Sequence, residues 1–276
     1  MKPACLVPDL SEPRVMAILN VTPDSFYADS RMSDASAIEH RVLEAVEEGA
    51  DLIDVGGYSS RPGAAEVSEE EEWRRVAAGI GAVRRVTSDL PVSVDTFRSG
   101  VVARAVECFG AVIVNDISAG ELDPRMFDVV ASYDLPYVAM HMRGTPQTMQ
   151  QQTDYRRDIT TEVIDYFRTR VAAMLAAGIR RERIILDPGF GFAKTVEQNY
   201  ALLAGLHRVC AEGFPVLAGL SRKSMIYKPL ECTPAESLAG TVALDWECLR
   251  QGAVILRVHD VREAVDTVRL YKLFRS

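Results

Sequence analysis

The sequence predicts an α/β protein, a TIM or (β/α)8 barrel preceded by a short irregular N-terminal lead. Eight short apolar runs alternate with eight helical patterns, and 276 residues is the usual size of eight such units. The runs are continuous rather than alternating in polarity, which is typical of parallel strands covered on both faces. An open doubly wound sheet uses the same units, but no G-x-G-x-x-G turn follows the first strand. We therefore expect residues 1–276 to form a single barrel domain.

The eight apolar runs are the expected strands. They cover residues 15–19, 52–55, 91–95, 112–114, 137–140, 184–186, 216–218 and 254–258. The expected helices cover residues 33–48, 68–88, 99–109, 124–133, 156–177, 196–210, 234–250 and 261–274. Ser68 and the glutamates after it mark a helix start, because a hydroxyl cap and negative charges both stabilise that end. Gly49 and Gly178 mark helix ends.

Composition restricts the classes of function. The net charge is −8 and no long basic run occurs. Nucleic acids and membrane surfaces attract positive proteins, so we expect neither as a partner. The five cysteines form no C-x-x-C pair, which indicates reduced thiols in a cytoplasmic protein. No window approaches the roughly 18 apolar residues of a membrane span, and residues 1–13 have no signal-peptide core.

Polar residues follow every expected strand at the same end. In a barrel, function collects at the C-terminal ends of the strands, where these residues would meet. The set is Asn20, Ser60, Arg61, Asp95, Asn115, Asp116, His141, Asp187, Ser221, Arg222, Lys223, Ser224, Arg257 and His259. A single such residue is often only a turn former, but eight coincidences predict a site.

Residues 185–194 place an acid, Asp187, at the end of an expected strand. This acid either faces a ligand or only terminates the strand. An apolar run stops at Asp187, and a loop with Pro188 and two glycines follows. A partly desolvated carboxylate, at Asp187 or Asp95, can accept two hydrogen bonds from an amidine-like N–H pair of a pterin or guanine ring. Lys194 either contacts the ligand or braces the loop.

Strand eight carries a cation where only apolar residues are expected. Arg257 needs a carboxylate or an anionic ligand, because an unpaired buried charge is costly. With His259 and Arg61 it would form a phosphate clamp. The alternative is an internal pair between Arg257 and Asp54.

Two further segments have weaker signals. Residues 219–224 suggest a strand end that turns into a short helix, where backbone N–H groups and Lys223 would attract an anion. A solvated basic turn is the alternative. Asn20 and Asp24 could hold Mg²⁺, which prefers oxygen ligands together with substrate phosphates.

The chain resembles the dihydropteroate synthase family over nearly its full length. The matching stretches are residues 18–26, 54–63, 93–96, 114–117, 140–146, 186–194, 221–224 and 257–261. The resemblance implies a pterin-binding barrel that joins 6-hydroxymethyl-7,8-dihydropterin diphosphate to 4-aminobenzoate and releases pyrophosphate. It also implies a homodimer and a dissociative displacement at the exocyclic carbon of the pterin.

The resemblance assigns roles to individual residues. The pterin would be held by Asp95, Asn115, Met140, Asp187 and Lys223. The diphosphate would be bound by Asn20, Arg61, Arg257 and His259, with Mg²⁺ at Asn20. The 4-aminobenzoate would lie near Ser60, Arg61, Pro62, Phe192, Lys223 and Ser224. The catalytic residues would be Asp95, Asp187, Lys223 and Arg257.

The chain departs from the family pattern in one block. Tyr58 and Ser60 stand where the family usually has glutamate and threonine, so a role for that acid is in doubt and the aminobenzoate contact is expected to be looser. One alternative is a pterin-binding methyltransferase domain, which needs no diphosphate clamp and is disfavoured by the clustered cations. Another is a catalytically silent paralogue, which the intact set of matching positions disfavours.

Overall fold

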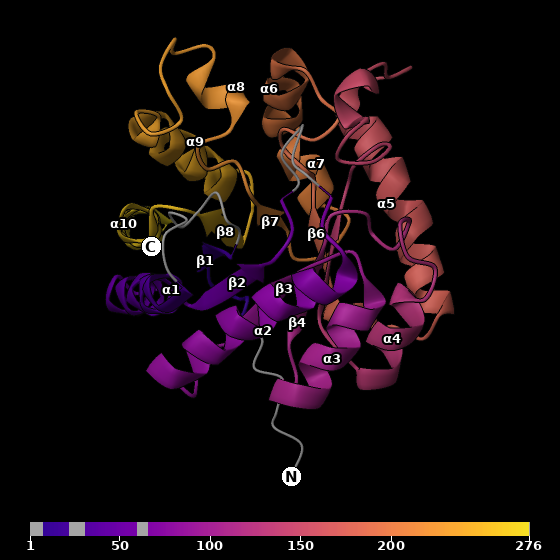
Figure 1. Ribbon diagram of the computed structural model, residues 1–276. Helices are drawn as coiled ribbons and strands as arrows, with labels where there is room; N and C mark the ends of the chain where they lie inside the picture. The colour runs from indigo at the N-terminus through magenta and orange to yellow at the C-terminus, as the bar shows by residue number, and fades with distance from the viewer. Residues whose placement is uncertain (1–7, 22–30, 60–65, 276) are drawn as a thin grey trace.

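The computed structural model describes residues 8–21, 31–59 and 66–275, without the side chains of residues 31–35. These residues contain one parallel sheet of eight strands with the order β6-β5-β4-β3-β2-β1-β8-β7. The strands are β1 Arg14–Asn20, β2 Leu52–Gly56, β3 Val92–Asp95, β4 Ile113–Asp116, β5 Tyr137–Met140, β6 Ile184–Asp187, β7 Leu217–Ala218 and β8 Ile255–Val258. A parallel bridge between Leu186 and Val216 joins β6 to β7. The sheet is thus a nearly closed barrel, which confirms the predicted fold class (Figure 1).

Helices surround the barrel and alternate with its strands (Figure 1). They are α1 Arg31–Glu47, α2 Glu69–Val86, α3 Ser99–Phe109, α4 Met126–Tyr133, α5 Ile159–Ala176, α6 Val196–Ala204, α7 Leu206–Cys210, α8 Ser224–Tyr227, α9 Leu238–Arg250 and α10 Val261–Arg275. Short 3₁₀ turns, η2 Met149–Gln151 and η3 Arg181–Arg183, complete the described elements. The predicted cap is confirmed, since the Ser68 hydroxyl accepts a hydrogen bond from the Glu71 N–H at 3.2 Å.

One predicted helix is broken and three begin later than predicted, among them α4, which begins at Met126 instead of residue 124. The helix expected over residues 196–210 is broken at Gly205, where a Cβ would overlap Thr160 of the packed helix α5. The helix expected from residue 156 begins after Asp158, whose carboxylate accepts a hydrogen bond from the Thr161 N–H at 3.0 Å. The helix expected from residue 234 begins at Leu238, because residues 234–236 form a separate turn and Ser237 is the N-cap residue.

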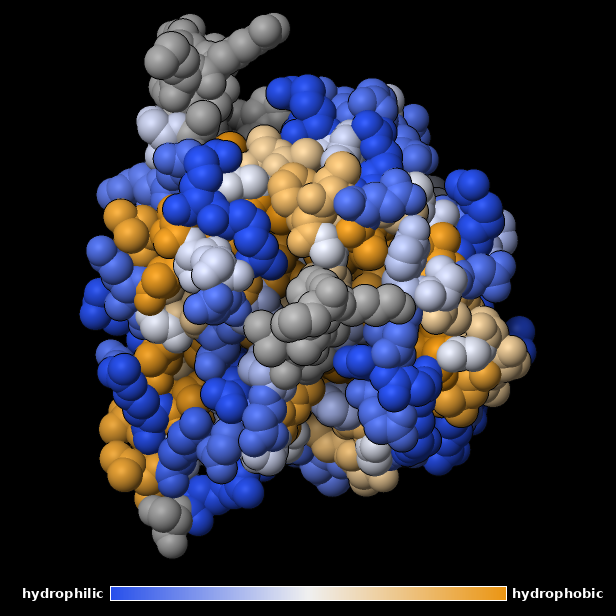
Figure 2. Space-filling model, turned by 90° about the horizontal axis from the view of Figure 1, so that it is seen from below, coloured by the Kyte–Doolittle hydropathy of each residue, from blue (hydrophilic) through white to orange (hydrophobic). Residues whose placement is uncertain are grey.

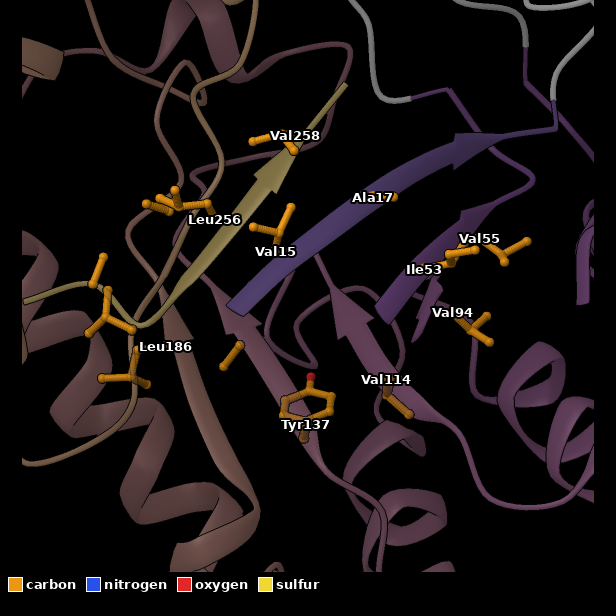
Figure 3. Packing of buried hydrophobic residues seen from close by; sticks show 14 of the residues in the cluster. Val15, Ala17, Ile53, Val55, Val94, Val114, Tyr137, Leu186, Leu256 and Val258 are labelled. Carbon is orange, nitrogen blue, oxygen red and sulfur yellow. The ribbon is translucent and has the colours of Figure 1, made fainter. Parts of the chain in front are cut away.

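Alternate residues of each strand face the helices. Figure 3 shows this outer layer, with Val15, Ala17, Ile53, Val55, Val94, Val114, Leu256 and Val258 among its members. The residues between them fill the lower barrel interior, namely Met16, Leu52, Ile113, Val138, Ile185, Leu217 and Ile255. Both faces of the strands are therefore buried, which explains the continuous apolar runs.

Hydrophilic residues predominate on the face of the molecule seen in Figure 2, and hydrophobic residues there form separate patches. Within the described residues, no helix is long and apolar enough to cross a membrane.

Candidate active site

A polar layer lies above the apolar layer of the barrel interior. Side chains two positions apart in a strand share a face, so the next interior residues towards the C-terminal strand ends are Asp54, Asp95, Asn115, Met140, Asp187 and Arg257. The strand register pairs Asp95 with Asn115 and Met140 with Asp187. The pleat and the register together thus bring these side chains to one end of the barrel.

Arg257 is the centre of an ion-pair network in this layer. Its Nε lies 2.6 Å from Asp54 Oδ2, and its Nη2 lies 2.7 Å from Asp95 Oδ2. Asn115 Nδ2 donates to the same Asp54 oxygen at 2.9 Å. Of the two partners left open by the sequence, the structure contains the internal Asp54 pair and adds a second carboxylate. A contact between Arg257 and a diphosphate stays a prediction.

The environment of Asp95 weakens it as an acid. Burial raises the pKa of Asp95 to about 7, Arg257 acts against this rise, and the neighbouring Asp54 carboxylate adds to it. The single positive charge of the guanidinium cannot neutralise the negative charges of both carboxylates. Asp95 therefore changes its charge near neutral pH, and it would be held ionised by N–H donors of a ligand.

Asp187 and Lys223 form the opposite side of the layer. Burial raises the pKa of Asp187, and Lys223 acts against the rise. Burial lowers the pKa of Lys223 to about 8, and Asp187 opposes that shift. Gly189 N donates to Asp187 Oδ1 at 2.8 Å. Each group thus stabilises the charge of the other inside a desolvated site.

Lys223 connects the acid to an aromatic ring. Its Nζ donates to the Phe190 carbonyl at 2.6 Å and lies 4.6 Å from the ring centroid of Phe192. A Cβ on Gly191 would lie 3.1 Å from Lys223 Cδ, so a larger residue there would crowd the lysine stem. The structure therefore brings together Asp187, Lys223 and Phe192, and their roles towards substrates stay predictions.

An apolar surface adjoins the polar layer. Its buried members are Ile117, Met140, Met142, Met149 and Ala193, and Phe97, Leu122 and Phe192 pack against them. Met140 belongs to both the surface and the interior layer. A flat ring whose edge meets the carboxylates could pack on such a surface.

The end of β8 is fastened to the loop after β7. Ser221 Oγ lies 3.1 Å from His259 Nδ1, and it also accepts a hydrogen bond from the His259 N–H at 3.2 Å. Arg222 forms a two-point ion pair with Asp260, with distances of 2.9 and 2.5 Å. Ser224 is the first residue of α8 and directly follows Lys223. These contacts place His259 and Lys223 on loops that are tied together.

Lys194 proves to be a brace of the loop. Its Nζ donates to the carbonyls of Gly189 and Phe192 at 2.9 and 3.0 Å, and it lies 2.9 Å from His141 Nδ1. The side chain is buried. Of the two roles that the sequence left open, these contacts support the second.

Glu72 was missed by sequence reasoning. It is fully buried, and it accepts hydrogen bonds from Thr96 Oγ1 at 2.5 Å and from Arg98 Nη1 at 2.6 Å. Its position in a run of glutamates indicated a solvated helix start. The available signal was its spacing of four residues from Val76, which places both on the buried face of α2.

Tyr58, which replaces the family's acid, makes aromatic contacts. Its ring packs edge-on against Phe97 with centroids 5.2 Å apart, and the Arg98 guanidinium lies 5.6 Å from the Tyr58 centroid. Its hydroxyl accepts a hydrogen bond from Gln147 Nε2 at 2.9 Å. Tyr58 thus links the end of β2 to the loop after β5.

Several predicted site residues lie outside the described residues, namely Asp24, Ser60, Arg61 and Pro62. Asn20 is described. A Cβ on Gly56 would lie 3.5 Å from Asn20 Oδ1 and 3.6 Å from Asp95 Cβ, so both side chains flank this glycine. In the part of the chain that the structure describes, no group of three or more His, Cys, Asp or Glu side chains could hold a metal ion.

Known proteins share both the sequence and the architecture. A family model described as "Pterin binding enzyme" matches residues 16–259. The dihydropteroate synthase of Escherichia coli strain K12 is 44% identical over 263 residues, which is 95% of this chain and 92% of that protein.

Solved structures agree with these matches. The structure of Xanthomonas albilineans dihydropteroate synthase with 4-aminobenzoic acid has a TM-score of 0.89 and 42% identity, covering 97% of this chain and 94% of the other. A structure of the Xanthomonas enzyme in complex with 7,8-dihydropteroate has a TM-score of 0.86 and 39% identity, covering 98% and 96%.

Proposed function

The chain belongs to the dihydropteroate synthase family of pterin-binding enzymes, which are transferases of folate biosynthesis, and from this membership we propose its reaction. It joins 6-hydroxymethyl-7,8-dihydropterin diphosphate to 4-aminobenzoate and releases pyrophosphate. The observation that carries the proposal is the interior layer in which Asp95, Asn115, Met140 and Asp187 meet at the C-terminal strand ends. Solved relatives with 4-aminobenzoic acid and with 7,8-dihydropteroate support the choice of substrates.

The polar layer suits recognition of a pterin. Asp187 and Asp95 would accept hydrogen bonds from the N–H edge of the ring, and Asn115 can both donate and accept. Met140 and its apolar neighbours offer a surface for the ring face. Lys223 would contact both substrates, since its charge interacts with Asp187 and its Nζ lies 4.6 Å from the ring centroid of Phe192.

The reaction fits a dissociative displacement. The bond between the exocyclic carbon and the diphosphate oxygen breaks, and the diphosphate leaves with the electron pair. The aromatic amine then forms the new C–N bond and loses one proton to solvent. Asp95 and Asp187 would stabilise the positive charge of the pterin, while Arg257 and His259, with Arg61 as the sequence predicts, would bind the leaving group.

Mg²⁺ at Asn20 is part of the proposal. One amide oxygen suits an ion that takes its remaining ligands from substrate phosphates and water. When bound, Mg²⁺ would neutralise charge on the leaving diphosphate. Asn20 lies beside Asp95 across Gly56, so its oxygen is placed at the same end of the barrel as the other site residues. An Asn20→Ala variant is expected to need more Mg²⁺ for half-maximal turnover.

The test is release of pyrophosphate by purified protein with Mg²⁺. Release from the pterin diphosphate should require 4-aminobenzoate, and no release with both substrates present would overturn the proposal. Asp187→Asn should lower turnover more than tenfold, which corresponds to about 1.4 kcal/mol of barrier. Asp128→Asn, an exposed carboxylate on α4, is the matched control and should leave turnover unchanged.

We also propose a cytoplasmic homodimer. Four described cysteines, Cys108, Cys210, Cys232 and Cys248, are free, which supports a reducing compartment. Leu270, Leu273 and Phe274 of α10 are 60%, 73% and 71% exposed, and exposed apolar residues that adjoin one another in this way are typical of an interaction site. Sedimentation of Phe274→Glu beside the wild type tests the assembly, and a wild-type monomer would refute it.

A further inference from the structure

The loop between β6 and α6, residues 188–195, has a backbone that needs support. Gly189, Gly191 and Ala193 have positive φ angles of 68°, 82° and 49°. This region is unfavourable for a residue with a side chain such as Ala193. A conformation of this kind persists only when its surroundings hold it. The contacts that hold the loop therefore also set the positions of the groups it carries.

Lys194 supplies three of these contacts from a buried position. The side chain is 4% exposed, and its Nζ reaches the carbonyls of Gly189 and Phe192 as well as His141 Nδ1. His141 follows β5, so the lysine ties the loop to the neighbouring strand end. Because its amine already has these three partners, Lys194 is not the group that meets a substrate.

One carbonyl that Lys194 holds belongs to Phe192 itself, and the other belongs to Gly189, two residues after Asp187. Gly189 N donates to Asp187 Oδ1 at 2.8 Å. The amine of Lys223 lies 4.6 Å from the centroid of the Phe192 ring. A shift of the loop would therefore move the acid expected to hold the pterin and the ring expected to contact 4-aminobenzoate at the same time.

We propose that Lys194 is a positioning residue, which holds the β6–α6 loop so that Asp187 and Phe192 meet the two substrates correctly. This inference rests on the proposed function for the identity of the substrates. Lys223 would touch the substrates directly, whereas Lys194 acts through two backbone carbonyls and the His141 ring.

The test removes the amine of Lys194 and keeps most of its aliphatic side chain. Lys194→Met should raise the Kd for pterin, measured by fluorescence titration, at least tenfold. It should also lower kcat/KM for 4-aminobenzoate at least tenfold and speed amide hydrogen exchange in residues 188–195. Lys272→Met makes the same change on α10, where the lysine pairs with Glu12 at 3.4 Å, and should change each constant less than twofold.

A second variant keeps the test decisive if Lys194→Met fails to fold. Lys194→Gln keeps N–H donors for the two carbonyls, so it should fold and lose less than Lys194→Met. The proposal is overturned if a folded variant keeps the pterin Kd and kcat/KM within threefold of wild type, even when its melting temperature falls. It is also overturned if neither variant folds, because Lys194 would then support the whole barrel. If wild-type protein makes no dihydropteroate, the proposed function fails, and pterin binding with hydrogen exchange still decides the role of Lys194.

Discussion

Replacing Asp54 by asparagine tests whether this carboxylate contributes more to the stability of the interior layer than to turnover. Asp54 is fully buried, and its Oδ2 meets both the Arg257 guanidinium at 2.6 Å and the Asn115 amide at 2.9 Å. Removing one partner of a buried ion pair costs about 3–5 kcal/mol. Arg257 keeps Asp95 at 2.7 Å, so we expect the lower figure, about 3 kcal/mol. For a chain of 276 residues this lowers the melting temperature by about 5 °C.

The matched variant is Asp95→Asn. The Asp95 side chain is 22% exposed, and after its replacement Arg257 still has the fully buried Asp54. Because burial raises the pKa of Asp95 to about 7, its charge does not stabilise the folded state at neutral pH, and its replacement should leave the melting temperature unchanged or higher. Turnover should fall more in Asp95→Asn than in Asp54→Asn, because Asp95 is the residue proposed to contact the pterin. Thermal melts and pyrophosphate-release assays measure both effects. A melting temperature for Asp54→Asn equal to or above that of Asp95→Asn would refute the reasoning.

Three further substitutions test other parts of the structure. Burial raises the pKa of Asp245 well above its usual range. The folded state therefore holds the Asp245 proton more tightly than the unfolded state, and the stability of the wild type falls as the pH rises above about 4. Because asparagine does not titrate, the melting temperature of Asp245→Asn relative to wild type should increase from pH 5 to pH 8. Glu72→Gln replaces the charged acceptor of Thr96 and Arg98 by a neutral amide, and urea unfolding should show a loss of about 2 kcal/mol. A loss below about 0.5 kcal/mol contradicts the network. Gly189→Ala should lose at least tenfold in pterin affinity, since its φ is 68° and the new Cβ would overlap the His141 carbonyl oxygen.

The polar layer could be predicted because it follows from local pattern. Asp95, Asn115, Asp187 and Arg257 each stand two residues beyond an interior position of a strand, and parallel strands of a barrel present such residues at one end. The spacing was therefore sufficient to group them. Burial of Glu72 was not expected, because in the sequence it is one of four consecutive glutamates and nothing local distinguishes it from the other three.

The fold class, the eight strands and the end of the barrel where polar residues collect all follow from the amino-acid pattern. Periodicity is a local property, so each element could be found without its neighbours. The partners of the charged residues follow instead from the packing of the barrel: Arg257 pairs with Asp54 and Asp95, and Lys194 holds two carbonyls of its own loop. Partner choice depends on distances between strands far apart in the chain and on burial, which determines how much an unpaired charge costs.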